Sequence, residues 1–324
     1  MFISISYATE KISFLNLNTS VELLKQNESY FVESSNLIVN ISNRLIIKTE
    51  THLQLAEQIY IKNIVTRVWQ AYQGESFNYY VAELKDGISI DSEIKQLSQI
   101  NGILLVQPDI LQHRVKTEAS KQHYLPNKQT LFDQVYFEHL DKLDGKNINI
   151  GIIDDGFDLT DADFKQTQIV FEYDVQNQSL SARPKNKLDY HGTKVAKIIF
   201  GKNNSFNGLA PLANFIAIRQ PTTWTSNTLL AFQVAKLNRA DIINCSWHSR
   251  MLLEPIKDVV DDLAVNGRSG KGTAVVFSAG NQGVKITKNI YEASINLAKV
   301  GRFSGTLMAA ARLSGLFAAV AVIE

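Results

Sequence analysis

From residue 147 onward, the sequence alternates continuous apolar runs of strand length with segments of helical periodicity. The apolar runs cover residues 147–153, 215–218, 241–245 and 273–278. Helical patterns begin at His191 and extend over residues 226–237 and 254–266. Strands that are apolar along their whole length are buried on both faces, which is typical of a parallel sheet covered by helices. The predicted fold class for residues 147–324 is therefore α/β, a mostly parallel sheet flanked by helices.

Residues 1–115 predict a smaller N-terminal α+β domain. Its clearest part is a β-α-β unit, in which a strand, an amphipathic helix and a second strand cover residues 77–84, 89–99 and 102–108. Before it, short β-like runs at 37–41 and 45–48 precede a helical stretch that begins near Thr51. Residues 1 to about 70 contain no recognisable chemistry.

Residues 116–146 separate the two predicted domains. They are polar, lack regular periodicity, and contain Pro126, several lysines and the segment Asp141–Gly145. This composition is typical of a linker that runs over a protein surface. We therefore place a domain boundary near residue 115.

The charge balance and the single cysteine exclude several classes of protein. The 33 Lys and Arg residues nearly cancel the 32 Asp and Glu residues, so we expect neither a nucleic-acid nor a membrane partner. Cys245 alone cannot form an intramolecular disulfide. The N-terminus lacks the basic flank and apolar run of a secretory signal, and the apolar segment Leu313–Ile323 is too short to span a bilayer. A cytoplasmic location is the default expectation, and secretion stays open.

Three polar residues with complementary chemistry stand at the ends of these elements. Asp154 follows the first strand of the sheet, His191 opens a helix, and Asn281 follows the last strand. In parallel sheets, functional residues collect at the carboxyl ends of the strands. A carboxylate can hold an imidazole as a general base, and a side-chain amide can donate to an oxyanion. The simpler interpretations are a turn residue for Asp154, a helix cap for His191 and a left-handed turn residue for Asn281.

Five segments, in the right order, resemble the motifs of the subtilisin-like serine peptidases, the subtilase family. They are Ile152–Asp158 (IIDDGFD), His191–Gly201 (HGTKVAKIIFG), Asn207–Arg219 (NGLAPLANFIAIR), Asp241–Trp247 (DIINCSW) and Gly272–Gly283 (GTAVVFSAGNQG). The Asp-Asp-Gly form of the first motif is similar to that of the kexin-like branch. The resemblance covers residues 147–324 and implies a serine endopeptidase. The unit from about residue 77 to 115 resembles a subtilase propeptide.

The resemblance also implies a role for each matching position. Asp154 would orient the histidine, His191 would be the general base, and Asn281 would donate to the oxyanion. The chain near Ser246 and Trp247 would hold the backbone of a polypeptide substrate or peptide ligand. No cofactor is expected, and calcium is suggested by the family alone.

The nucleophile motif of the family, Gly-Thr-Ser-Met-Ala-Ala-Pro, is broken in this chain. The matching segment is Gly305–Arg312 (GTLMAAAR), with Leu307 in place of the serine and Ala311 in place of the proline. Leucine has no nucleophilic atom. Removal of the serine from subtilisin lowers kcat by about 2 × 10⁶, which corresponds to about 8–9 kcal/mol. We therefore expect a chain that is inactive or severely impaired and that at most binds peptides.

The interval between Asn281 and Leu307 is also shorter than in the family. The missing material falls near residues 301–305, since Tyr291–Gly301 still resembles the next family strand. Loss of this segment together with the serine indicates a decayed or repurposed protease. A truncated gene would give the same pattern.

Two other functions stay open. The chain could be an active endopeptidase with an unrecognised nucleophile, for which Ser304, Ser314 and Cys245 are the candidates. A cysteine at the end of a buried strand is usually a small packed residue. The chain could instead be a structural or regulatory binding module.

Two lysines depart from the family's histidine motif, and several aspartates lie in or close to the first motif in the sequence. Lys194 and Lys197 replace the usual His and Gly of the histidine motif. The residues after the first strand form an acidic run, which consists of Asp154, Asp155, Asp158, Asp161 and Asp163. The spacing is not that of an EF-hand, so we predict a solvated loop and no metal site.

Overall fold

The structure is a computed structural model that describes residues 10–35, 37–53, 55, 59–112, 144–203, 206–278 and 306–320. Of residues 206, 306–309, 319 and 320, only the backbone is described. The chain divides into two compact units. The first unit comprises residues 1–113 together with 223–229 and 250–259, and the second comprises the remainder.

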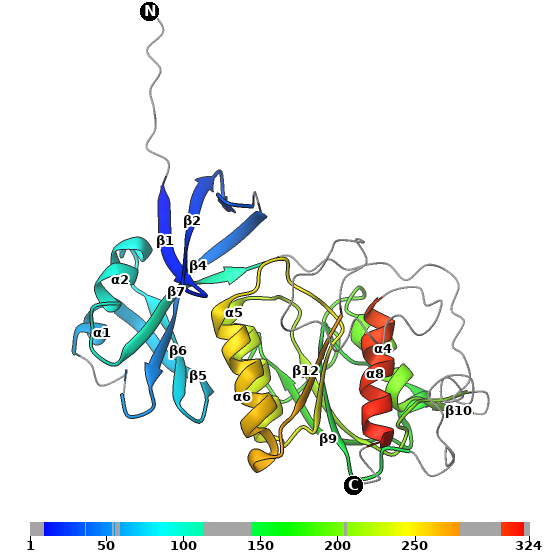
Figure 1. Cartoon of the computed structure of the whole chain (residues 1–324). Helices are drawn as coiled ribbons and strands as arrows, with labels where there is room; N and C mark the ends of the chain where they lie inside the picture. Colours follow the sequence, from blue (N-terminus) through cyan, green and yellow to red (C-terminus); the bar gives the residue numbers. More distant parts are fainter. Residues whose placement is uncertain are drawn as a thin grey trace, which may run out of the picture. The chain divides into compact units, whose positions relative to one another are not determined.

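The first unit is built on antiparallel strands (Figure 1). Its elements are β1 (Lys11–Asn16), β2 (Thr19–Gln26), β3 (Ser29–Val32), β4 (Leu37–Glu50), α1 (Ile59–Ile64), β5 (Val65–Gln73), β6 (Phe77–Leu84), α2 (Ile90–Leu97) and β7 (Ile103–Leu111). The strands form one sheet in the order β1-β2-β3-β4-β6-β5, and β7 also pairs with β4. Both β6 and β7 pair antiparallel with β4. In the predicted β-α-β unit, β6 and β7 are therefore not neighbours in the sheet, because each pairs with β4.

One prediction for this unit is wrong. The helical stretch expected to begin near Thr51 is reduced to the six residues of α1, and the chain continues as the unpredicted strand β5. The β5 sequence VTRVWQAYQ is rich in β-branched and aromatic residues, which favour a strand. The two short runs at 37–41 and 45–48 belong to a single strand, β4.

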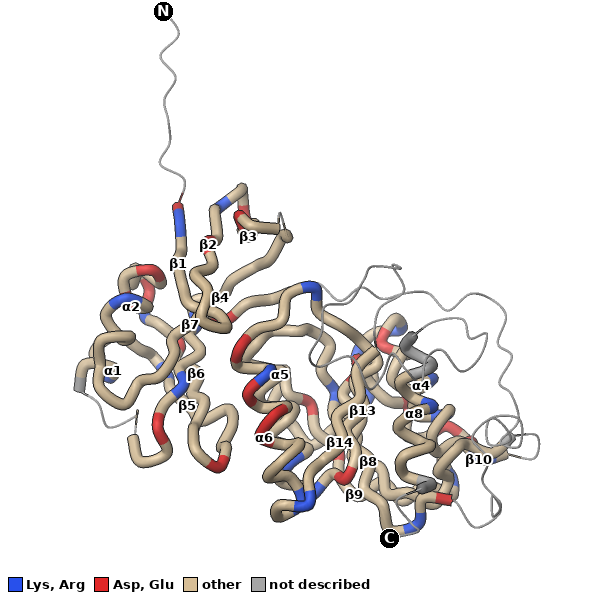
Figure 2. The backbone as a smooth tube through the Cα atoms, in the orientation of Figure 1, with Lys and Arg blue, Asp and Glu red and all other residues tan. Residues whose placement is uncertain are grey.

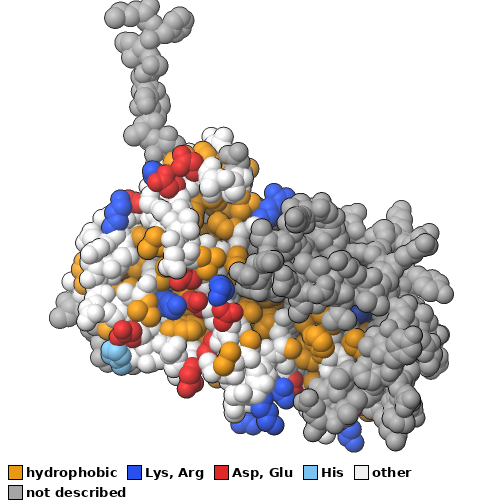
Figure 3. All heavy atoms as spheres, in the orientation of Figure 1, with side chains coloured by type: hydrophobic (Ala, Val, Ile, Leu, Met, Phe, Trp, Pro, Cys, Tyr) orange, Lys and Arg blue, Asp and Glu red, His pale blue; other side chains and the backbone are white. Residues whose placement is uncertain are grey.

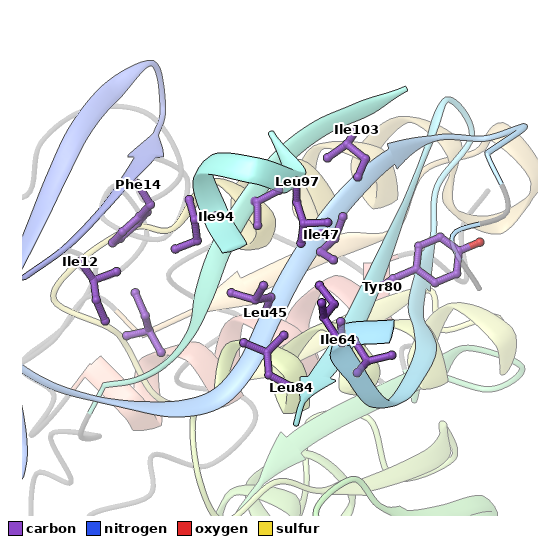
Figure 4. Packing of buried hydrophobic residues seen from close by; sticks show 14 of the residues in the cluster. Ile12, Phe14, Leu45, Ile47, Ile64, Tyr80, Leu84, Ile94, Leu97 and Ile103 are labelled. Carbon is purple, nitrogen blue, oxygen red and sulfur yellow. The ribbon is translucent and has the colours of Figure 1, made fainter. Parts of the chain in front are cut away.

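The core of the first unit lies between this sheet and its helices (Figure 4). Leu45 and Ile47 alternate along β4 and are fully buried on the same face. Ile94 and Leu97 lie three residues apart on α2 and turn toward the same cluster. The apolar alternation of the strand and the helical spacing of α2 therefore meet in one core.

A buried carboxylate also ties the first unit together. Asp109 of β7 forms an ion pair with Arg44, at 2.8 Å from Nη2. It accepts hydrogen bonds from the backbone N–H and the hydroxyl of Ser226, at 2.9 and 2.8 Å. Ser226 lies in the first turn of α5 (Thr225–Leu237). Asp109 therefore accepts a hydrogen bond from a backbone N–H group that has no partner within the helix. Burial raises the pKa of Asp109, although Arg44 and Ser226 offset part of the rise.

The surface of the described chain mixes charge signs and apolar side chains. Acidic and basic residues are interspersed along the backbone (Figure 2). The face drawn in Figure 3 exposes apolar side chains among polar ones on the first unit. Among the described residues of the first unit, the most exposed large apolar ones are Leu15, Ile38 and Leu104. No helix among the described residues is long and apolar enough to cross a bilayer.

The second unit is built on a parallel sheet. Its elements are β8 (Asn149–Asp154), η3 (Ala162–Phe164), β9 (Gln168–Asp174), α4 (His191–Phe200), β10 (Lys202–Asn203), β11 (Phe206–Asn207), β12 (Asn214–Arg219), β13 (Ile242–Cys245), β14 (Ala274–Phe277) and α8 (Thr306–Val320). Residues of α5 and of α6 (Glu254–Gly270) are shared between the two units. Five strands pair in the order β14-β13-β8-β12-β9, and every pair is parallel. The predicted α/β class with a parallel sheet is confirmed.

Helices cover both faces of this sheet (Figure 1). Ile150 and Ile152 of β8 share a core cluster with Val195 of α4 and Ala311 of α8. On the other face of β8, a Cβ at Gly151 would meet Ala235 of α5 at 3.6 Å. Burial on both faces explains why β8 and β12 are continuous apolar runs, with their polar residues at the strand ends.

Candidate active site

The structure brings Asp154 and His191 together at the carboxyl end of β8. His191 Nδ1 lies 2.9 Å from Asp154 Oδ1 and 3.0 Å from Oδ2. Asp154 is buried, whereas 27% of the His191 side chain is exposed. A carboxylate on Nδ1 favours the tautomer in which Nε2 accepts a proton. The pair therefore has the geometry of a general base with its orienting acid.

The next residue, Asp155, holds the start of the helix that carries His191. Tyr190, which precedes α4, makes no side-chain hydrogen bond to the helix. The carboxylate of Asp155 accepts from the backbone N–H of Gly192 at 2.9 Å and from that of His191 at 3.4 Å. These N–H groups would otherwise be open at a helix N-terminus, where negative charge is favourable. Asp154 thus holds the ring of His191, and Asp155 holds its backbone.

Because Gly192 has no side chain, α4 can pack closely against the end of β8. A Cβ at this position would lie 2.6 Å from the Gly156 carbonyl oxygen and 2.9 Å from Asp154 Cβ. It would also lie 2.9 Å from the ring of Phe157. Any larger residue would therefore push His191 away from Asp154.

Neighbouring segments fix the end of β8 from both sides. The backbone N–H of Gln220, after β12, donates to the Asp154 carbonyl at 2.6 Å. Trp247, after β13, donates its indole N–H to the Ile153 carbonyl at 2.8 Å. The position of Asp154 is therefore set by the sheet itself.

A buried arginine anchors the segment that leads to His191. Arg219 Nη1 lies 3.0 Å from Asp174 Oδ2, and Nη2 lies 2.7 Å from Asp189 Oδ2. Burial raises the pKa of Asp189, but hydrogen bonds from Arg219 and from the N–H groups of Lys185 and Asn186 outweigh it and lower the pKa. The sequence reasoning missed this cluster, although an arginine that closes an otherwise apolar strand could have pointed to it.

The structure describes only some of the remaining predicted site residues. Ser246 and Trp247 follow β13, and both side chains are buried. Asn281, the segment 301–305 and Ser304 lie outside the described residues. Leu307 lies in the first turn of α8, where only the backbone is described.

Two of the alternative nucleophiles are buried. Ser314 of α8 donates its hydroxyl to Asn244 Oδ1 and to the Ala310 carbonyl, both at 3.0 Å. Its exposed fraction is 0%, as is that of Cys245. A substrate carbonyl could not reach either atom without rearrangement of the core.

The acidic run differs from the predicted solvated loop. Asp154 and Asp155 are buried, and Asp161 and Asp163 are half-buried against Lys197. In the part of the chain that the structure describes, no group of three or more His, Cys, Asp or Glu residues could hold a metal ion.

A parallel α/β sheet with a carboxylate–imidazole pair at a strand end is typical of hydrolases that use the Asp–His arrangement of serine peptidases. Residues 145–296 match the sequence model of the subtilase family. The chain is 26% identical over 310 residues to a calcium-dependent protease of Nostoc sp., an alignment that covers 85% of this chain and 46% of that protein. It is 30% identical over 159 residues to the kexin of Candida albicans, covering 44% of this chain and 16% of the kexin.

Among solved structures, fervidolysin from Fervidobacterium pennivorans aligns with a TM-score of 0.56 at 14% identity, over 98% of this chain and 57% of that one. This likeness shows the fold. Over residues 145–296, the α/β domain of the chain is therefore similar to the subtilase family. It spans about half the length of the curated relatives it matches first.

Proposed function

We propose that this subtilase-like chain no longer hydrolyses peptide bonds and that it acts by binding extended peptides. The observation that carries the proposal is Leu307 at the position of the family's nucleophile serine. His191 can accept a proton through Nε2, but the leucine side chain has no O–H or S–H to donate one. Loss of the nucleophile alone corresponds to about 8–9 kcal/mol of transition-state stabilisation.

The burial of other nucleophilic atoms supports the loss of hydrolysis. Ser314 uses its hydroxyl in hydrogen bonds inside the second unit, and Cys245 is packed in the sheet. The alternative of an active endopeptidase therefore depends on Ser304 or on a residue that the motifs do not indicate.

The proposed peptide site is the chain that follows β13. Because the side chains of Ser246 and Trp247 are buried, recognition would use backbone groups, and it would depend little on the side chains of the peptide. The relatives named above are proteases, and their substrates are polypeptides by definition. We extend only that class of ligand to this chain.

The propeptide-like interpretation of residues from about 77 to 115 is part of the same proposal. The β6, α2 and β7 elements form a split β-α-β unit on the antiparallel sheet. A chain without a nucleophile cannot remove this unit by its own chemistry, so we expect the unit to remain covalently attached.

The proposal is tested with fluorescein-labelled casein as an unstructured protein. We expect saturable binding by fluorescence anisotropy and no fragments on gels after long incubation. Turnover that both Asp154→Ala and His191→Ala abolish would instead establish an active endopeptidase. Absence of both binding and turnover would favour a structural or regulatory module.

A further inference from the structure

Inside the second unit, the ammonium group of Lys197 lies between two aspartates of the acidic run. Lys197 Nζ is 2.6 Å from Asp161 Oδ2 and 3.1 Å from Asp163 Oδ2. The three side chains are 30%, 16% and 20% exposed. Lys197 belongs to α4, six residues after His191, whereas the aspartates flank and form the short helix η3.

The other oxygens of these carboxylates also face hydrogen-bond donors. Asp161 Oδ1 accepts from the backbone N–H of Asp163 at 3.0 Å, and Tyr190 donates its hydroxyl to Asp161 Oδ2 at 3.5 Å. Asp163 Oδ1 accepts from the side-chain amide of Asn203 at 2.9 Å. All four carboxylate oxygens therefore have a donor partner, and donors from α4, η3 and β10 converge on them.

This arrangement does not fit a bound calcium ion. Calcium takes six to eight oxygen ligands at about 2.3–2.6 Å. The donors around Asp161 and Asp163 include an ammonium and an amide nitrogen, neither of which can act as a ligand. A lysine ammonium at this position already supplies a positive charge and three N–H donors.

We propose that Lys197 is a built-in cation that ties η3 to the helix carrying His191, and that this part of the chain therefore needs no calcium. This cation stands where the histidine motif of the family usually has glycine. The hydrogen bonds that Lys197 donates to Asp161 and Asp163 outweigh burial and raise the pKa of Lys197, which agrees with a stable ion cluster. The inference concerns folding stability and is independent of the proposed loss of hydrolysis.

The test compares thermal midpoints of the full chain in EDTA and in millimolar CaCl₂. Lys197→Met is compared with Lys194→Met, which removes an exposed lysine from the same helix. We expect the wild-type midpoint to be the same in both buffers. Lys197→Met should lower the midpoint by about 2–4 °C in both, while Lys194→Met should leave it unchanged.

Further variants keep the result decisive. If Lys197→Met does not fold, Lys197→Arg should fold with a near wild-type midpoint, because it keeps the charge. In the Lys197→Met background, Asp161→Asn should recover part of the loss, because it removes one of the two carboxylates that the substitution leaves without a cation. The proposal is overturned if Lys197→Met behaves like Lys194→Met, or if calcium raises the wild-type midpoint and Asp163→Asn removes that rise. A rise that survives both Asp161→Asn and Asp163→Asn comes from another site and supports the proposal.

Discussion

His191 is held at two points by consecutive residues of one strand end. Asp154 binds its ring nitrogen, and Asp155 binds the first backbone N–H groups of its helix. Arg219 adds a third restraint, since it anchors Asp189 two residues before the histidine. A catalytic group that is restrained in this way loses little entropy when it reacts. The same restraints keep the pair assembled whether or not a nucleophile faces it.

At the residue scale, Gly192→Ala should separate this pair. The added methyl would meet the Gly156 carbonyl at 2.6 Å, so α4 would have to shift. We expect the free energy of unfolding to fall by about 1–3 kcal/mol, as in overpacked cores. Urea unfolding followed by circular dichroism measures this. The matched control, Lys194→Ala, lies exposed in the same helix and should change stability by no more than about 0.5 kcal/mol. Equal effects of the two variants would contradict the packing argument.

The sequence predicted Asp154 and His191 but not the residues that hold them. Motif spacing identifies side chains at the ends of elements, because those positions follow from strand and helix periodicity. The contacts of Asp155, Lys197 and Arg219 cross between elements that are up to 45 residues apart. Their partners depend on how the elements pack, which local patterns do not specify.

At the scale of the element, β4 organises the first unit, because it pairs with β3, β6 and β7. Leu45→Ala would leave a cavity in its buried face and should lower the free energy of unfolding by about 2–5 kcal/mol. Ile38→Ala, on the same strand at 56% exposure, should change it by about 0.5 kcal/mol or less. The measurement is again urea unfolding, monitored by far-UV circular dichroism. A loss for Ile38→Ala as large as for Leu45→Ala would mean that β4 is not the centre of this core.

Elements with a clear apolar pattern were predicted well, and the edge strand β9, which has a mixed polar sequence, was not. The prediction of 254–266 for one helix agrees with the structure, in which α6 is regular up to Asn266 and turns non-helical from Gly267. In contrast, β9 was not predicted. It lies at the edge of the parallel sheet, and most of its residues are exposed or half-buried. A half-buried edge strand has a mixed polar sequence, so it lacks the continuous apolar run on which the prediction relied.

For the whole molecule, acid should lower the stability. Hydrogen bonds from cations outweigh burial and lower the pKa of Asp161 and Asp189 below their ordinary value. Their contribution is therefore complete above about pH 4 and is lost as the pH falls through the lowered pKa. Thermal midpoints from pH 7 down to pH 2 measure the effect, and Asp161→Asn should flatten the curve. A midpoint that stays constant down to pH 2 would contradict the role of these ion pairs.

The residues that make up each unit could not all be predicted from the sequence. Local composition predicts a boundary near residue 115. It does not predict the membership of residues 223–229 and 250–259 in the first unit, because that membership rests on contacts such as Asp109 with Ser226, 117 residues apart. Composition and periodicity are local properties, so they cannot assign such segments.

The central claim is that a formed Asp154–His191 pair stands in a chain without a nucleophile. Labelling with a fluorophosphonate probe tests it most directly, because the probe reacts with a serine only when a base activates it. We predict no labelling of the purified full chain above that of heat-denatured protein, next to a subtilisin that labels fully. Labelling at one serine that is lost on its replacement by alanine, and lost again in His191→Ala, would contradict the account.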